Sequence, residues 1–367
     1  MFEFSQLEVV ELEITNRCQA SCPMCPRNIH GGIENPLLKI NDWTIDNFKN
    51  IFSVDLVKKI KNFTFCGNFG DPLLNNDIVS MLDYITFNNK NVYVSIHTNG
   101  SLRSRTWWKD LVKVLPKNHD VIFALDGLAD THHLYRIGTD FTKIIENASS
   151  FINAGGNANW QFIKFNHNKH QVEDAKQLST QLGFKKFILK NTRRFTQSKF
   201  KVVDKKGMFS HFLKPAEDTI KIVDKNVLLN EFNHWKNTDN IFCKPKAVNA
   251  VYIDCHYTLV PCCIIASWFY TSFDERIYKM YNLHDVKKSV NSIGEDIRQE
   301  VFQLVRELGG FEFLNVLTNS IEDILSSDIY NKIWEEKWRA HQLMTCSLMC
   351  SADSPFITLD EQKVKNV

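Results

Sequence analysis

Strand-like and helix-like segments alternate along the first half of the chain, and this alternation constrains the fold more than any other feature. Six short apolar or β-rich runs occur, and an amphipathic helical pattern separates most of them from the next. The strands are expected at residues 9–14, 61–66, 92–97, 121–125, 159–165 and 186–189. Such an order implies parallel strands joined by right-handed crossovers.

The intervening helices are expected at residues 44–60, 77–88, 103–115, 141–154 and 172–182. Six strands are too few for a complete eight-stranded barrel, so the pattern alone allows either a doubly wound sheet or a partial barrel. In both folds the chemistry gathers at the carboxyl ends of the strands. The residues that follow each strand are therefore the candidates for a site.

The alternation ends near residue 195, and this predicts the domain organisation. Residues 1–195 form the first unit, and the polar residues 196–240 are expected to be an irregular connection. Residues 241–355 form a second unit, rich in Cys and aromatic residues, with amphipathic helices over 292–308 and 321–341. Residues 356–367 are expected to be a tail.

Composition excludes several classes of protein. The net charge of +2 gives no overall nucleic-acid signature. Residues 1–10 lack the pattern of a signal peptide, and the longest apolar run, near 260–270, is too short to span a bilayer. We therefore expect a cytoplasmic protein with no membrane partner. In a reducing compartment, its ten cysteines favour metal binding or catalysis over disulfides.

The cysteines gather in two places, and the first group follows the first strand directly. Cys18, Cys22 and Cys25 lie in the spacing CxxxCxxC. Thiolates suit iron–sulfur clusters, with zinc as the main competitor. Three ligands on one loop leave one corner of a four-iron cluster free to bind a reactant. The alternative is a zinc site that takes a fourth ligand from elsewhere.

This loop resembles the cluster loop of the radical S-adenosylmethionine (SAM) superfamily. The resemblance places Met24 near the adenine of SAM. The segment 66–74, after the second strand, resembles the family's GGEP motif, which holds the SAM amino group. It implies that Asn68, Gly70 and Asp71 contact SAM, with Asp71 standing where Glu is commoner.

Three further segments match the family in order, each at a strand end. Thr98 and Asn99 stand in a Thr-Asn-Gly motif, whose polar residues lie near the SAM ribose and carboxylate in the family. Asp126 and Arg136 match the stretch SLDG…H…R, in which the Arg meets the SAM carboxylate. Asn166 matches an Asn near the ribose. The resemblance covers roughly residues 8–190 and implies an α/β fold, the partial (β/α)6 TIM-like barrel.

The second group of cysteines resembles the auxiliary-cluster extensions called SPASM and twitch. Cys243 and Cys262 fit the spacing of that family, with Tyr257 where Gly is usual, and Cys346 and Cys350 return two more thiolates. Together these four would hold one auxiliary [4Fe-4S] cluster, in a Cys-rich α+β extension. Two other cysteines, Cys255 and Cys263, can replace one ligand or bind nothing, and a zinc-stabilised lobe is the alternative.

The resemblance also implies a reaction. An external one-electron reductant, flavodoxin- or ferredoxin-like, would reduce the [4Fe-4S] cluster, and SAM would split to a 5′-deoxyadenosyl radical. That radical would abstract hydrogen from a small molecule (a sugar, alcohol or nucleotide) or from a peptide, and the auxiliary cluster would accept an electron. This describes an oxidoreductase.

Two alternatives to this oxidoreductase remain open. One is a redox-neutral epimerase or isomerase, with Cys66 as hydrogen donor. The other is a non-enzymatic zinc or iron–sulfur module. A basic stretch, residues 185–206, holds nine Lys and Arg against one acid and includes Arg193 and Arg194. It suits an acidic substrate or, more simply, a solvated face.

Overall fold

A computed structural model gives the fold and describes residues 3–192, 194–195, 198–216, 243–270, 284–339 and 343–350. One mixed sheet dominates it, with the strand order β12-β11-β1-β4-β5-β6-β7-β8. These strands are β1 (Val9–Leu12), β4 (Asn62–Phe65), β5 (Tyr93–Thr98), β6 (Asn118–Ala124), β7 (Ala158–Lys164), β8 (Lys186–Asn191), β11 (Ala250–Ile253) and β12 (Leu259–Val260). Two small hairpins pair β2 (Asn28–Ile29) with β3 (Ile33–Glu34), and β9 (Phe200–Val203) with β10 (Phe209–Leu213).

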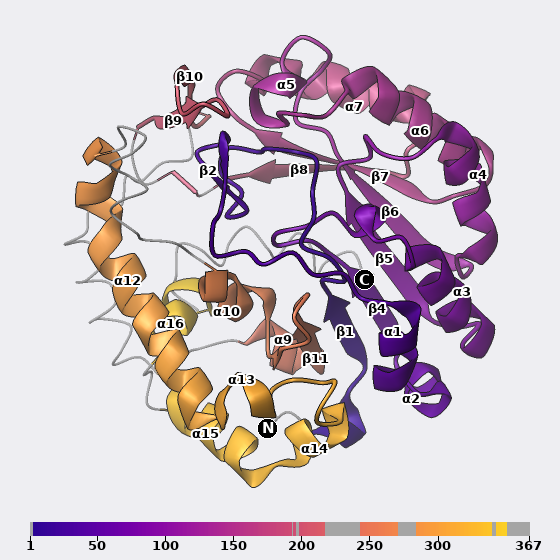
Figure 1. The fold of residues 1–367 in the computed structure, drawn as a ribbon. Helices are drawn as coiled ribbons and strands as arrows, with labels where there is room; N and C mark the ends of the chain where they lie inside the picture. Colours follow the sequence, from indigo (N-terminus) through magenta and orange to yellow (C-terminus); the bar gives the residue numbers. More distant parts are fainter. Residues whose placement is uncertain are drawn as a thin grey trace.

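The helices of the first half follow the strands and lie along the outer side of the sheet, while the segment after β1 crosses its inner side (Figure 1). These helices are α1 (Ile45–Ile51), α2 (Val54–Lys59), α3 (Ile78–Asn88), α4 (Arg105–Val114), α5 (His132–Tyr135), α6 (Phe141–Asn153) and α7 (Val172–Gln181). The later helices are α9 (Lys244–Ala247), α10 (Cys263–Ser267), α12 (His284–Glu307), α13 (Gly310–Phe313), α14 (Ile321–Ser326), α15 (Asp328–Arg339) and α16 (Met344–Cys350).

The strand order decides between the two architectures that the sequence pattern allows. From β1 to β8 each long strand pairs in parallel with the next one along the chain, without a reversal. A doubly wound sheet reverses its order at a switch point, whereas a barrel does not. The predicted partial (β/α)6 TIM-like barrel is therefore confirmed.

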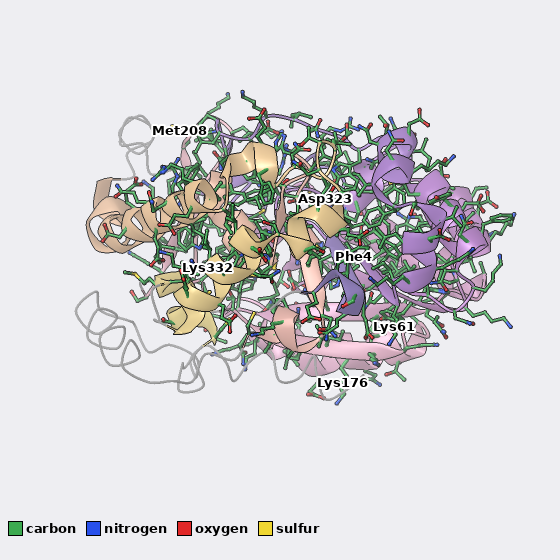
Figure 2. The ribbon with its side chains drawn as sticks, turned by 90° about the horizontal axis from the view of Figure 1, so that it is seen from below. Phe4, Lys61, Lys176, Met208, Asp323 and Lys332 are labelled. Atoms are coloured by element: carbon green, nitrogen blue, oxygen red, sulfur yellow. The ribbon has the colours of Figure 1, made fainter. Side chains whose placement is uncertain are left out.

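The C-terminal region continues the same sheet. Strand β11 pairs in parallel with β1, with Val9 opposite Ala250, and then turns back through a short antiparallel pairing with β12. β1 consequently has a neighbour on each side, β4 and β11. The N-terminal residues take part as well, since Phe4 lies beside α14, the helix that carries Asp323 (Figure 2).

Some elements differ from the sequence-based expectations. The helix expected over 44–60 is two helices, because Ser53 begins α2 and its Oγ accepts from Leu56 N at 3.3 Å. The helix expected over 321–341 is likewise divided, at Ser327, into α14 and α15. The helix expected over 292–308 begins earlier, at His284.

The connection expected to be irregular, residues 196–240, contains an ordered part. Residues 200–213 form the β9–β10 hairpin, although their polar composition suggested no element. The remainder of that connection beyond residue 216 and the expected tail, 356–367, lie outside the described residues. The proposed domain boundaries therefore remain predictions. Within the described residues, no helix is long and apolar enough to cross a membrane.

The core between sheet and helices is strongly aromatic. Phe63 of β4 is fully buried, with its ring 5.4 Å from that of Phe52 and 6.4 Å from that of Phe48. These contacts join the first helix pair to the second parallel strand. They hold β4, whose carboxyl end carries the segment 66–74, against the outer layer.

Replacing Phe63 with Ala is expected to cost about 3–5 kcal/mol of unfolding free energy, because it removes a buried ring and leaves a cavity. Chemical denaturation at fixed ionic strength measures the loss. Phe87→Ala is the matched control, since that ring is 75% exposed, and it should change stability by less than about 0.5 kcal/mol. Equal losses in the two variants would contradict this account of the core.

Candidate functional site

The loop that leaves β1 carries the three cysteines predicted to hold a cluster. The backbone N–H of Cys25 donates to the carbonyl of Cys22 at 3.0 Å, which closes a turn between them. Burial raises the pKa of all three thiols, to about 11 for Cys25, and neighbouring cysteines add to the shift at Cys18 and Cys25. The three sulfurs therefore lie close enough to interact electrostatically.

Each of these sulfurs has a polar neighbour from another element. Asn99 Nδ2 lies 3.8 Å from Cys18 Sγ, and Arg136 Nη1 lies 3.8 Å from Cys22 Sγ. The Cys25 thiol is 3.7 Å from the carbonyl oxygen of Asn68. N–H groups directed at cysteine sulfur, and burial of the thiolates, are features that stabilise and tune iron–sulfur clusters. This donor set fits such a cluster.

A single metal ion finds no preformed site in this part of the chain. Among the residues that the structure describes, no three Cys, His, Asp or Glu side chains are drawn together as one ion requires. The fit to a four-iron cluster rests on the three thiols, of which Cys22 is buried and Cys18 and Cys25 are partly buried, and on their polar neighbours. In such a cluster, each thiolate binds a different iron atom.

Arg136 and Asp126 form a buried ion pair beside the cysteine loop. Arg136 Nε lies 2.6 Å from Asp126 Oδ2, and the Asp126 side chain is fully buried. Burial raises the pKa of Asp126, and the Arg136 charge opposes that shift. Truncating either partner would leave an uncompensated charge. The pair therefore fixes Arg136 in place, with its Nη1 directed at Cys22.

Asp71 is fully engaged by the protein itself. Its carboxylate accepts from Thr98 Oγ1, from the backbone N–H of Asn99 at 2.8 Å, from Asn99 Nδ2 at 2.6 Å and from Leu73 N. Burial raises the pKa of Asp71. The carboxylate thus joins the segment after β4 to the one after β5 and orients Asn99. A direct contact of Asp71 with the SAM amino group remains a prediction.

Glycine is required in the segment after β4 because backbones meet there. A Cβ on Gly70 would stand 2.0 Å from the carbonyl oxygen of Thr15, and one on Gly67 would stand 1.5 Å from the carbonyl oxygen of Gly70. Both distances are far below contact. Asn68, between them, donates from Nδ2 to the carbonyl of Cys263 at 2.8 Å. The segment is therefore packed against both β1 and the C-terminal region.

Three residues that the sequence predicts to contact SAM or to donate hydrogen make contacts with other parts of the protein. Met24 is buried, and its carbonyl accepts from Arg194 Nη1 at 2.7 Å. Asn166 donates its backbone N–H to the carbonyl of Lys214 at 3.0 Å. Cys66 is partly buried and packs against the apolar core. SAM contacts of Met24 and Asn166, and hydrogen donation by Cys66, stay predictions.

Asn168, two residues beyond the predicted Asn166, is a polar group that the sequence did not single out. Its Nδ2 donates to the carbonyls of Asp126 and Ile163, and its Oδ1 accepts from Phe165 N at 2.7 Å. The side chain is fully buried. It therefore stabilises the turn after β7 and the carboxyl end of β6. Only its position shortly after a strand hinted at this role.

Glu13 is the second residue that the sequence analysis missed. Its Oε1 accepts from the backbone N–H groups of Phe69 at 2.6 Å and Gly70 at 3.0 Å, and its Oε2 accepts from Tyr252 Oη at 2.7 Å. Burial raises the pKa of Glu13 to about 7, against the hydrogen bonds that lower it. The carboxylate joins β1 to the segment after β4 and to β11.

The cysteines of the C-terminal region are brought together in part. The pKa of Cys262 is raised by burial first, and then by the nearby Cys263, Cys346 and Cys243. Cys350 follows Cys346 by four residues on α16, which places both on one helical face. The arrangement is compatible with the four predicted ligands, whose binding of a cluster remains a prediction.

Cys255 and Cys263 differ in their surroundings. Cys255 is fully buried, and burial raises its pKa, with further contributions from the nearby carboxylates of Glu13, Asp254 and Asp42. Cys263 lies next to Cys262 in the chain and contributes to its shift. Of these two spare cysteines, Cys263 stands nearer to the predicted auxiliary site.

The unusual Tyr257 can be explained from the backbone. Its φ of 69° lies in the left-handed region, where glycine is favoured. A Tyr at this position gains contacts instead, because its ring stacks on Trp43 at 4.8 Å and its hydroxyl accepts from Asn47 Nδ2 at 2.8 Å. The turn between β11 and β12 thus keeps the glycine geometry without a glycine.

Glu300 of α12 fixes the start of the helix that carries Cys346 and Cys350. Both carboxylate oxygens accept from the backbone N–H of Met344, at 3.0 and 2.8 Å. A carboxylate at a helix N-terminus satisfies N–H groups that have no partner within the helix. Burial raises the pKa of Glu300 to about 7. This contact positions α16 against α12.

Comparison with known proteins agrees with the fold. The sequence matches no protein-family model and no curated protein. Native anSMEcpe with bound AdoMet and the Cp18Cys peptide shares 14% identity over 98% of each chain, with a TM-score of 0.50. Streptococcus suis SuiB bound to its precursor peptide SuiA also shares 14% identity, over 80% of this chain and 67% of that one, with a TM-score of 0.50.

These matches concern architecture, since identity is only 14% in each. The chain therefore has the fold of these two structures, a partial barrel with a C-terminal extension, which is the fold that the resemblance implied. More particularly, its sheet and extension align over nearly the whole length of a structure that holds AdoMet.

The titration of Glu13 predicts a pH dependence of stability. Its folded pKa, about 7, lies above its ordinary value of 4.5, so the folded state binds more protons than the unfolded state between those values. The contribution of Glu13 to the free energy of unfolding is complete below pH 4.5. It decreases by about 3 kcal/mol as the pH rises to about 7. Denaturation of Glu13→Gln from pH 5 to 8 should lack this decline.

The matched control for Glu13 is Glu173→Gln, an exposed carboxylate on α7. Its pH profile should run parallel to that of the wild type. A Glu13→Gln profile that also runs parallel to the wild type would contradict a buried, proton-binding Glu13.

A second prediction concerns Glu300. Replacing it with Ala removes the carboxylate that accepts from Met344 N, at a cost of about 1–2 kcal/mol to the anchoring of α16. Iron and sulfide per chain should then fall by up to one cluster's worth, the loss expected when Cys346→Ala removes a predicted ligand. Asp296→Ala, which removes an exposed carboxylate of the same helix, is the control and should keep full iron content. Full iron content in Glu300→Ala would remove this residue from the support of the auxiliary site.

Proposed function

We propose that this chain is a radical SAM enzyme, an oxidoreductase that removes hydrogen from a small-molecule or peptide substrate. The observation that carries the proposal is the loop of Cys18, Cys22 and Cys25. Its three thiols interact with one another, and Asn99, directly after β5, and Arg136, directly after α5, reach it from two other segments. A cluster and SAM bound there would supply, when reduced by an external flavodoxin- or ferredoxin-like protein, a 5′-deoxyadenosyl radical.

Residues of the chain itself would bind and orient the cluster and SAM. Asn99 stands between the loop and Asp71, because its Nδ2 reaches both Cys18 Sγ and the Asp71 carboxylate. Arg136, held by Asp126, places a permanent cation beside Cys22. A cation there suits the carboxylate of SAM as well as buried thiolates. Since both groups are held by buried carboxylates, little reorganisation would accompany binding.

The C-terminal cysteines support an oxidative reaction. Cys243, Cys262, Cys346 and Cys350 would hold a second, fully ligated cluster, which would take an electron from the substrate radical. Electrostatic proximity of the first three supports this proposal. The redox-neutral alternative needs Cys66 as a hydrogen donor, but Cys66 packs against the apolar core. Deuterium entering the product from solvent would favour that alternative.

The decisive experiment is anaerobic reconstitution of the wild type with iron and sulfide, followed by dithionite and SAM. We expect cluster absorbance and the release of 5′-deoxyadenosine. Cys22→Ala removes one of three ligands to the cluster, so deoxyadenosine should fall to the background of the assay. Melting curves of the metal-free proteins check that this variant folds.

Cys255→Ala is the matched control, because that buried cysteine has acidic groups rather than the loop cysteines as its electrostatic neighbours. It should cleave SAM at the wild-type rate. Zinc at the three cysteines of the wild type, or undiminished cleavage by Cys22→Ala, would overturn the proposed function.

A further inference from the structure

A cavity of about 210 Å³ lies beside the cysteine loop, and Met24 is the one residue of its lining that is also predicted to contact SAM. Residues 23–26 of the loop form one wall, and Asn28 and His30 of the β2–β3 hairpin form another. Two more residues line the cavity: Arg194 and Phe200, the first residue of β9. Cys25 itself lines the cavity, so a molecule held there would lie directly next to the proposed cluster.

Two hairpins hold the His30 wall rigidly. His30 Nδ1 donates to the carbonyl of Lys201 at 2.6 Å, and its ring stacks on Phe200 with centroids 4.4 Å apart. The backbone N–H of Val203 donates to the carbonyl of His30 at 3.0 Å. Burial lowers the pKa of His30, which leaves a neutral ring. The wall is therefore preformed, flat and largely apolar.

Asn28 contributes an unsatisfied hydrogen-bond donor to the residues that line the cavity. Asn28 is 8% exposed, and its Nδ2 has no hydrogen-bond partner. A buried amide N–H₂ without a partner is costly unless a ligand or water accepts from it. This unsatisfied donor points to a ligand that carries an acceptor.

Arg194 adds a positive charge at the rim. Its Nη1 donates to the carbonyl of Met24, and among the described residues no carboxylate pairs with its guanidinium. It belongs to the basic stretch 185–206, with nine Lys and Arg against one acid. Its neighbour Arg193 lies outside the described residues. Arg194 therefore places a positive charge in the lining of the cavity.

We propose that this cavity binds the substrate through an anionic group, a carboxylate or a phosphate, carried on an apolar body. Arg194 and Asn28 Nδ2 bind the anion, and the apolar body packs against Met24 and the His30–Phe200 pair. This inference rests on the proposed function, since it places the substrate beside the cluster loop. It assigns the basic stretch a role in recognition, in place of a merely solvated face.

Calorimetric titration of the anaerobically reconstituted wild type tests the site with three probes: benzoate, phenyl phosphate and the neutral benzyl alcohol. At least one anion should bind about tenfold more tightly than the alcohol, because a charge-assisted hydrogen bond is lost with the charge. Comparing the affinities for benzoate and phenyl phosphate distinguishes a carboxylate site from a phosphate site. Benzyl alcohol binding as tightly as both anions would overturn the assignment.

Variants locate the binding. Arg194→Gln and Asn28→Leu should each weaken the binding of the preferred anion. The loss of affinity should be about tenfold for Arg194→Gln, which removes a charge. Lys206→Gln, an exposed cation of the same stretch, should leave affinity unchanged. Iron content checks that each variant keeps its cluster. Unchanged affinity in Arg194→Gln, or displacement of the anion by SAM, would overturn the inference.

These outcomes are separable from a failure of the proposed function. A wild type that releases 5′-deoxyadenosine yet binds neither anion would overturn only the cavity assignment. A wild type that binds zinc and forms no deoxyadenosine would overturn the function, whatever the probes do.

Discussion

The site depends on one buried carboxylate, that of Glu13. It accepts two backbone N–H groups from the glycine segment after β4 and the hydroxyl of Tyr252 from β11. Since that segment also provides Asp71, which in turn orients Asn99, a chain of contacts runs from β1 to the cysteine loop. Without Glu13, two backbone donors and a buried hydroxyl would have to find other partners.

Buried charge recurs throughout the site, and each charged group is balanced differently. Asp126 is paired directly with Arg136, whereas Asp71 accepts hydrogen bonds from neutral donors and interacts with the Arg136 charge without an ion pair. The cysteine thiols have raised pKa values, because burial opposes the thiolate form. A cationic cluster core would reverse that preference, since metal binding stabilises thiolates. Burial therefore makes the loop unfavourable as a free anion and suited to metal.

The order of strands and helices could be predicted because it depends on local periodicity, and the cysteine loop because its spacing is local as well. Glu13 could not be predicted, because an acidic residue in a strand of alternating apolar and acidic residues is expected to face solvent. Its carboxylate is held by the segment after β4 and by Tyr252 of β11, and β11 lies some 240 residues away. The β9–β10 hairpin was missed because its apolar residues do not alternate regularly: Val202 and Val203 are consecutive and both buried, whereas Phe209 is exposed. His30 from another segment contacts this hairpin.

The pairing of β11 with β1 has a consequence for how the chain is made. The strand that leads into the cysteine loop is synthesised some 240 residues before its partner across one edge, which begins at Ala250. Until then β1 presents an unpaired edge, which is a known route to misassembly. The buried surroundings of the loop are therefore completed late, and iron insertion on a nascent chain would meet an unfinished pocket.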